Sequence, residues 1–170
     1  MLPETTRLIL REMTAADYDA LRAIMQDPQV MYAYEGPFTD EEVRAWLNRQ
    51  LERYARFGFG LWAVVLKETG RVIGQCGLTM QPWKEESVLE IGYLFRRDAW
   101  HRGYATEAAR ACREYAFSVL GAREVCSIIR DTNLASQNVA RRNGMTPRDT
   151  WIKHFRGVDM PHIRFAITRP

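Results

Sequence analysis

The chain has 170 residues, and its 24 Lys and Arg residues against 21 Asp and Glu residues leave a formal net charge of +3 at pH 7. This length predicts a single domain over residues 1–170, and contents of 46% hydrophobic and 26% charged residues exclude a disordered chain. The sequence lacks a signal peptide, a metal-ligand spacing among its three cysteines and an apolar run of the roughly 20 residues that a membrane span needs, which predicts a cytoplasmic protein without a membrane or metal partner.

The first part of the chain predicts one strand and two helices. Residues 7–11 have the composition of a short strand, and Thr14 and Asp17 form a capping box for a helix that ends before Pro28. A second capping box, Thr39 to Glu42, begins a longer helix that closes near Gly58. Its expected apolar face consists of Val43, Trp46, Leu47, Leu51 and Tyr54.

The rest of the chain predicts strands with two further helices between them. Residues 61–66 and 72–80 read as a hairpin, and a third strand, 88–95, follows a turn at 82–87. A helix over 103–121 and a strand over 124–129 then suggest a parallel strand–helix–strand unit. A short helix over 133–143 precedes two strands, 150–155 and 162–168, with a turn at 157–159. The predicted fold is α/β, a mixed sheet with helices on its faces in the order β-α-α-β-β-β-α-β-α-β-β.

The loop before the third helix is the most informative segment. It carries Arg96, Arg97, His101 and Arg102 and leads into Gly103, at the start of a helix with small residues. Free amide groups at a helix N-terminus and nearby arginines favour phosphate binding. The alternative is a well-capped helix with solvated arginines. The incomplete glycine fingerprint disfavours a dinucleotide site, and a P-loop is excluded because its motif is absent.

Two segments together resemble one enzyme family. Residues 100–108, WHRGYATEA, resemble the acetyl-CoA pyrophosphate loop of the GNAT N-acetyltransferases in the form of their RimJ/RimL-like branch. Residues 133–145, NLASQNVARRNGM, are similar to the N-x-x-S…G-[FM] helix of that branch. The resemblance covers nearly the whole chain and implies the direct transfer of an acetyl group from acetyl-CoA to a primary amine, without a metal.

The resemblance also implies roles for particular residues. The backbone of one strand would pair with the pantetheine arm of acetyl-CoA, and Asn133 would contact that arm from the fourth helix. Ser136 would lie near the thioester sulfur. The strand residues are Tyr93, Leu94 and Phe95, and the amides of His101, Arg102, Gly103, Tyr104, Ala105 and Thr106 would hold the pyrophosphate.

The chain departs from the family at one catalytic position, because many family members carry a tyrosine acid where this chain has Ala140. Tyr104 and Ser136 are the available hydroxyls for protonating the departing thiolate, although Tyr104 also suits plain packing. Glu90, on the strand that leads to the site, is the candidate base. Its alternative role is that of an outer-face charge or an arginine partner.

The acceptor cannot be read from the sequence. Glu35 and Tyr34, in the loop between the first two helices, could bind a cationic substrate, although a solvated carboxylate is the commoner meaning of Glu35. A basic run, Arg141 to Arg156, could bind RNA or the cofactor's 3′-phosphate, but the small net charge disfavours a nucleic-acid partner. The alternatives to an enzyme are a non-catalytic acyl-CoA-binding module and a ribosome-associated protein. The chain would act as a monomer or a homodimer.

Overall fold

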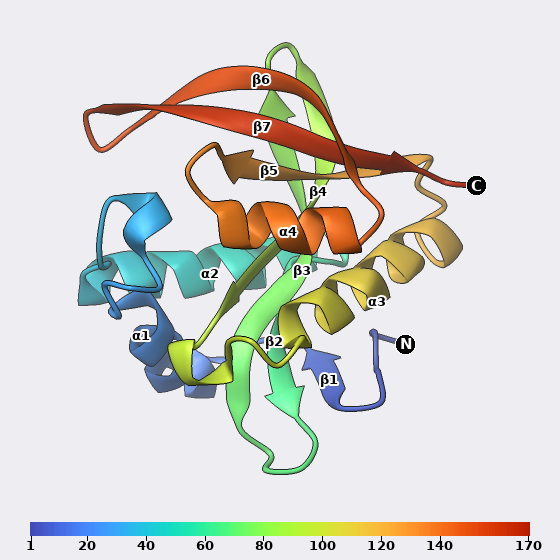
Figure 1. The fold of residues 1–170 in the computed structure, drawn as a ribbon. Helices are drawn as coiled ribbons and strands as arrows, with labels where there is room; N and C mark the ends of the chain where they lie inside the picture. The colour runs from blue at the N-terminus through green and yellow to red at the C-terminus, as the bar shows by residue number, and fades with distance from the viewer.

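The computed structural model describes residues 1–170 as one mixed sheet with helices on both faces (Figure 1). Four α-helices and three short 3-10 segments accompany the strands. The strands are β1 (Leu8–Arg11), β2 (Leu61–Leu66), β3 (Val72–Trp83), β4 (Glu86–Phe95), β5 (Glu124–Arg130), β6 (Thr146–Phe155) and β7 (Val158–Thr168). The helices are α1 (Tyr18–Met25), α2 (Asp40–Phe57), α3 (Tyr104–Ser118) and α4 (Leu134–Arg142).

The seven strands form one sheet in the order β1-β2-β3-β4-β5-β7-β6. Every neighbouring pair is antiparallel except β4 and β5, which are parallel and are connected through α3. The predicted α/β fold, its element order and its parallel unit are therefore confirmed. None of the helices combines the length and the apolarity that a membrane span requires.

Neighbouring residues of β3 show which helices cover which face, because successive side chains of a strand point to opposite faces. The Cys76 Sγ atom lies 3.6 Å from the Sγ atom of Cys112 in α3. The adjacent Gln75 accepts, through Oε1, a 2.8 Å hydrogen bond from the indole of Trp46 in α2. One core therefore lies between the sheet and α3, and a second lies between the sheet and the α1–α2 pair. In Figure 1, α3 and α4 lie in front of the central strands and α2 lies behind them.

The buried face of α2 differs from the predicted one at one position. Leu51, predicted to be apolar core, is 37% exposed, whereas the side chain of Gln50 is completely buried. Gln50 accepts, through Oε1, a 3.1 Å bond from the Leu61 amide and a 3.2 Å bond from Arg53, and it donates to the Trp46 carbonyl. Burying a side-chain amide costs little free energy when its polar atoms are hydrogen-bonded. Gln50 therefore faces the core and binds the start of β2.

Two predicted turns are shorter than expected. β3 extends to Trp83 and leaves only residues 84–85 for the turn, because the buried Trp83 donates from its indole to Asp149 at 3.1 Å. The β6–β7 turn contains only Arg156 and Gly157, with φ angles of 49° and 74°. A two-residue turn with two positive φ angles matches the twist of a hairpin, and it carries the chain directly from Phe155 to Val158.

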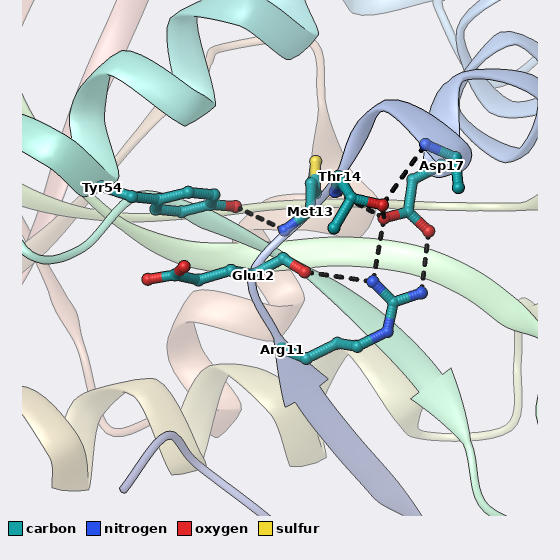
Figure 2. A network of polar contacts seen from close by, with 7 residues as sticks. Arg11, Glu12, Met13, Thr14, Asp17 and Tyr54 are labelled. Carbon is teal, nitrogen blue, oxygen red and sulfur yellow. Dashed lines mark hydrogen bonds and ion pairs between the residues drawn. The ribbon is translucent and has the colours of Figure 1, made fainter.

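A polar network fixes the segment between β1 and α1 to the end of α2 (Figure 2). The Arg11 guanidinium makes two 2.8 Å bonds to the Asp17 carboxylate and so holds the pKa of that carboxyl below its ordinary value. The Met13 amide donates to the Tyr54 hydroxyl at 3.2 Å, and this hydroxyl donates to the Leu61 carbonyl. Burial raises the pKa of Tyr54 to about 12. Through these two contacts, Tyr54 fixes the C-terminal part of α2 to Met13, after β1, and to Leu61, at the start of β2.

Candidate active site

The sheet opens where β4 and β5 diverge. Only one residue pair, Glu90 and Cys126, is in register between these parallel strands. Beyond it, side chains replace backbone partners: the Ser127 hydroxyl donates to the Ile91 carbonyl at 2.8 Å, and the Ile128 amide donates to the Glu90 carboxylate at 3.3 Å. Residues 92–95 of β4 therefore have no registered partner on this side. Crevices at the carboxyl ends of parallel strands are common ligand sites.

A cavity of about 400 Å³ occupies this opening and reaches both faces of the sheet. Thr79 and Glu90 are paired across β3 and β4 and share the face of Gln75, so their side chains lie on the α2 side. Tyr93 lies on the α4 side, because its hydroxyl donates to the Ser136 carbonyl at 2.7 Å. The polar lining includes Tyr34, Trp46, Arg49, Arg53, Thr79, Gln81 and Glu90, together with Tyr93, Ser127, Arg130, Asn133, Ser136, Lys153, His154 and His162.

Glu90 lies deep in this cavity, within reach of two hydrogen-bond donors. Its carboxylate accepts a bond from the Thr79 hydroxyl at 3.3 Å as well as the Ile128 amide bond. Burial raises the pKa of Glu90 above its ordinary value, against the opposing effects of the Lys153 charge and of the two hydrogen bonds. A carboxylate with a raised pKa is a stronger base, which suits proton removal from a substrate.

The structure separates the two candidate substrate residues. Tyr34 lines the cavity and meets the rings of Phe38 and Trp46 edge-on, at centroid distances of 5.8 and 6.2 Å. Burial, together with the nearby Glu90 charge, raises the pKa of Tyr34 to about 12 and keeps its hydroxyl protonated. Glu35 does not line the cavity, and its carboxylate pairs with the Arg130 guanidinium at 2.5 Å. The negative charge of Glu35 is therefore already compensated within the protein.

Asn133 and Ser136 come together at the start of α4. The Asn133 Oδ1 atom caps the helix by accepting from the Ser136 amide at 3.2 Å, and it also accepts from the Tyr32 hydroxyl at 2.8 Å. These bonds leave the Asn133 Nδ2 group available as a donor. Ser136 is one of the residues that line the cavity, and its hydroxyl has no hydrogen-bond partner in the protein. Ala140, one turn further on, is 1% exposed and belongs to the core.

The start of α3 offers a row of free donors. The backbone amides of residues 101–106 have no acceptor in the protein, and Gly103, the N-cap, provides no side-chain cap. His101 and Gly103 have φ angles of 59° and 78°, so the loop turns sharply before the helix begins. Successive amides in such a turn form a concave anion site. The residues therefore fit a pyrophosphate group.

The N-terminal segment anchors this loop. Glu107 of α3 accepts bonds from the Thr5 hydroxyl at 2.6 Å and from the Arg7 side chain at 2.7 Å, and Arg7 also donates to the Arg102 carbonyl at 3.0 Å. The side chain of Tyr104 is 7% exposed, and the Arg7 guanidinium lies over its ring at 4.5 Å from the ring centroid. The structure does not bring the Tyr104 side chain into the cavity with Glu90 and Ser136.

The charges of the loop also divide into two groups. Arg96 pairs with Asp98 at 3.0 Å, and Arg97 pairs with Asp27 at 3.3 Å. His101 and Arg102 are exposed, and their side chains have no acidic partner within the chain. The loop therefore offers these two side chains, rather than all four basic residues, to an anion.

Sequence reasoning missed several residues of the cavity. Arg49 and Arg53 stand four residues apart on α2 and both line it, and Lys153 of β6 reaches it from the other side. Their spacing was a readable signal, since residues at i and i+4 share one helix face. The basic run does not form one surface: Lys153 lines the cavity, whereas Arg156 pairs with Glu42 at 2.7 Å. No group of three His, Cys, Asp or Glu side chains is arranged to hold a metal ion.

Comparisons with known proteins agree with this geometry. A family model described as an acetyltransferase (GNAT) domain matches residues 7–146. The uncharacterized protein YkkB of Bacillus subtilis (strain 168) is 38% identical over 142 residues, which cover 83% of both chains. The uncharacterized N-acetyltransferase YnaD of the same strain is 30% identical, over 83% of this chain and 80% of YnaD. An acetyltransferase of known structure from Agrobacterium tumefaciens str. C58 matches with a TM-score of 0.82 and 31% identity, over 98% of this chain and 93% of that one. The chain belongs to the GNAT acetyltransferase family and is an N-acetyltransferase.

Proposed function

We propose that the protein transfers the acetyl group of acetyl-CoA directly to a primary amine while both substrates are bound. The observation that carries this proposal is the cavity through the sheet, with Glu90 on its α2 side and Ser136 on its α4 side. Two substrates that enter from opposite faces can meet in such an opening without a covalent enzyme intermediate. The RimJ/RimL-like form of residues 100–108 and a cytoplasmic location are parts of the same proposal.

The acetyl-CoA side of the proposal rests on donors and an open strand edge. The free amides of residues 101–106 would hold the pyrophosphate, with His101 and Arg102 adding charge. The pantetheine arm would run along Tyr93, Leu94 and Phe95, where β4 has no registered neighbour on its β5 side, and pair as an added strand. Asn133 would contact this arm through its free Nδ2 group.

The chemistry then requires three tasks of the protein. Glu90 takes a proton from the substrate ammonium, so that the neutral amine nitrogen can attack the thioester carbon. A backbone amide of β4 beyond Ile91, which the diverging strands leave open, stabilises the oxyanion that forms. As the C–N bond forms and the C–S bond breaks, the nitrogen loses its second proton and the thiolate accepts one. The net products are the amide, CoA and one proton released to solvent.

The departing sulfur is the open step, because the buried Ala140 supplies no acid. Ser136 is the residue that we propose for this step, since it lines the cavity and its hydroxyl has no partner in the protein. A serine is a weak acid, so it would act as a hydrogen-bond donor whose bond strengthens as the sulfur gains charge. Because the tyrosine acid is missing at position 140, a second function is a non-catalytic acyl-CoA-binding module. Such a module would bind acetyl-CoA but would never release CoA in response to an amine.

Two measurements test the proposal. Calorimetry should show acetyl-CoA binding that Gly103→Val weakens about tenfold or more, because valine is strained at the positive φ of 78° and would displace the amides of the loop. Gly70→Val is the matched control, because Gly70 has a similar positive φ of 68° in a hairpin turn, with no heavy atom near an added Cβ. Equal affinity in folded Gly103→Val and Gly70→Val variants would contradict the cofactor site. If none of the amines tested releases CoA from bound acetyl-CoA, the result would favour the binding module.

A further inference from the structure

The amine side of the cavity carries an unusual excess of positive charge. Glu90 is the only carboxylate in its lining, whereas Arg49, Arg53 and Lys153 all reach it. A fourth cation, Arg130, is paired with Glu35 at 2.5 Å and adds no net charge. Even with Glu90 ionised, two positive charges in the lining remain uncompensated.

Neutral partners hold these three cations in place. Arg53 donates to the Gln50 amide oxygen at 3.2 Å, and the Arg49 guanidinium lies 5.9 Å from the centroid of the Trp46 ring. The Lys153 ammonium lies beside two tryptophan rings, 5.9 Å from the centroid of Trp83 and 6.0 Å from that of Trp151. Amides and aromatic faces orient a cation without neutralising it. These contacts orient the three cationic side chains and leave their charges available to an anionic ligand.

The charges also have an energetic cost. Arg49 and Arg53 lie at i and i+4 on one helix face, and like charges at this spacing destabilise a helix. Burial, together with the Arg49 charge, lowers the pKa of Arg53, and only Glu90 acts in the opposite direction. Their contacts within α2 are with the neutral Gln50 and Trp46, and neither arginine forms a salt bridge. This lack of a negative partner points to a ligand that compensates their charge.

The phosphates of acetyl-CoA are not this ligand in the proposed arrangement. Their donors lie at the start of α3, on the face opposite α2. Arg49 and Arg53 instead share the α2 side with Glu90 and Thr79, where the amine would enter. The uncompensated charges therefore face the acceptor.

We propose that the acceptor is a small primary amine that also carries an anionic group, a carboxylate or a phosphonate, with the dimensions of an amino acid. Its ammonium group lies at Glu90, and its anionic group lies at Arg53 and Arg49, with Lys153 adding attraction. The small size follows from the cavity volume of about 400 Å³, which the acetyl end of acetyl-CoA must share. A polyamine would place further positive charge among these cations and is disfavoured. This inference rests on the acetyltransferase activity proposed above.

Matched pairs of amines test the inference in a thiol-release assay. The probes are the free L-amino acids, their carboxamides and the corresponding aminoalkylphosphonates, with spermidine as the polycation. For the best amino acid, kcat/KM should exceed that of its carboxamide about tenfold or more, because the carboxamide cannot make the charge-assisted bonds. The phosphonates show which anionic group is accepted. Carboxamides or spermidine used as well as the acids would overturn the inference, and so would an acidic pentapeptide used better than every amino acid.

A variant pair locates the effect. Arg53→Gln should reduce the preference for acid over carboxamide about tenfold, while acetyl-CoA affinity, measured by calorimetry, stays unchanged. Arg44→Gln is the control, because Arg44 lies on the same helix over the Tyr18 ring and does not line the cavity. An unchanged preference in Arg53→Gln and in the corresponding Arg49→Gln variant would overturn the inference. The wild-type comparison of acids with carboxamides stands even if neither variant folds.

The outcomes distinguish the inference from the proposed function. CoA release with carboxamides or polyamines, without a preference for acids, contradicts only the anionic acceptor. No CoA release with any probe, while acetyl-CoA still binds, contradicts the acetyltransferase activity on these amines and the inference together.

Discussion

Replacing Glu90 by glutamine separates catalysis from folding. The substitution keeps the shape of the side chain: the amide oxygen can still accept from the Ile128 amide, and the amide nitrogen can donate to the Thr79 hydroxyl, both at the present 3.3 Å. The opening between β4 and β5 should therefore persist. What is lost is the base. Because positioned general bases contribute about 10² to 10⁴-fold in rate, kcat/KM for the best amine should fall within that range.

The pH dependence follows from the raised pKa of Glu90. In the wild type, kcat/KM should decline as pH falls through a value above the ordinary carboxyl range, because the protonated residue is no base. The Glu90→Gln variant should lose this decline. The amine contributes its own titration to both enzymes, so the comparison between them, rather than either profile alone, reports Glu90.

Stability should change in the opposite direction from activity. A carboxyl group whose pKa is raised in the folded state contributes its full stability below the unfolded pKa and loses it as pH rises through the folded pKa. At neutral pH the buried Glu90 charge is therefore a cost, which glutamine removes. Thermal unfolding of the variant at neutral pH should occur at the same temperature as in the wild type or higher. A variant that keeps more than about one tenth of the wild-type kcat/KM would refute the role of Glu90 as the base.

Three further predictions concern the α4 side and the absence of a metal. Ser136→Ala should lower kcat and kcat/KM together by about 10²-fold if the hydroxyl assists the thiolate; a variant that keeps more than about half of the wild-type kcat in steady-state assays assigns the proton to solvent or to another group. Tyr32→Phe removes the hydroxyl that binds Asn133 and should raise the KM for acetyl-CoA with little change in kcat, and an unchanged KM would show that this bond does not position Asn133. EDTA should leave turnover unchanged, and activity that is lost with EDTA and restored by zinc would contradict the metal-free reaction.

Local signals in the sequence predicted the helices well. Both capping boxes, at Thr14 and Thr39, are present in the structure, and α4 begins directly after its N-cap Asn133, where the predicted helix over 133–143 starts. These features involve residues only three apart, so no knowledge of the fold is needed to find them. The same holds for the parallel unit, whose order of strand, helix and strand is local.

The features that sequence reasoning missed depend on distant residues. The turn after Trp83 is short because the Trp83 indole donates a hydrogen bond to Asp149, which lies far along the chain. Gln50 is buried because its side chain accepts a hydrogen bond from the Leu61 amide, beyond the loop between α2 and β2. Arg49 and Arg53 have no role predicted from the sequence, and only the packing of α2 beside the opening shows that they line a cavity. Glu90 and Glu35 looked alike as carboxylates, and the pairing of Glu35 with Arg130 distinguishes them.

The most direct test of the account is a crystal structure of the protein with CoA. We predict that the pyrophosphate contacts the amides of residues 101–106 and that the pantetheine arm lies along residues 93–95 of β4. The sulfur should enter the cavity beside Ser136. Density for the CoA sulfur in the opening between β4 and β5, with Glu90 across from it, would confirm the transfer site. A CoA molecule whose sulfur lies outside this cavity would contradict it.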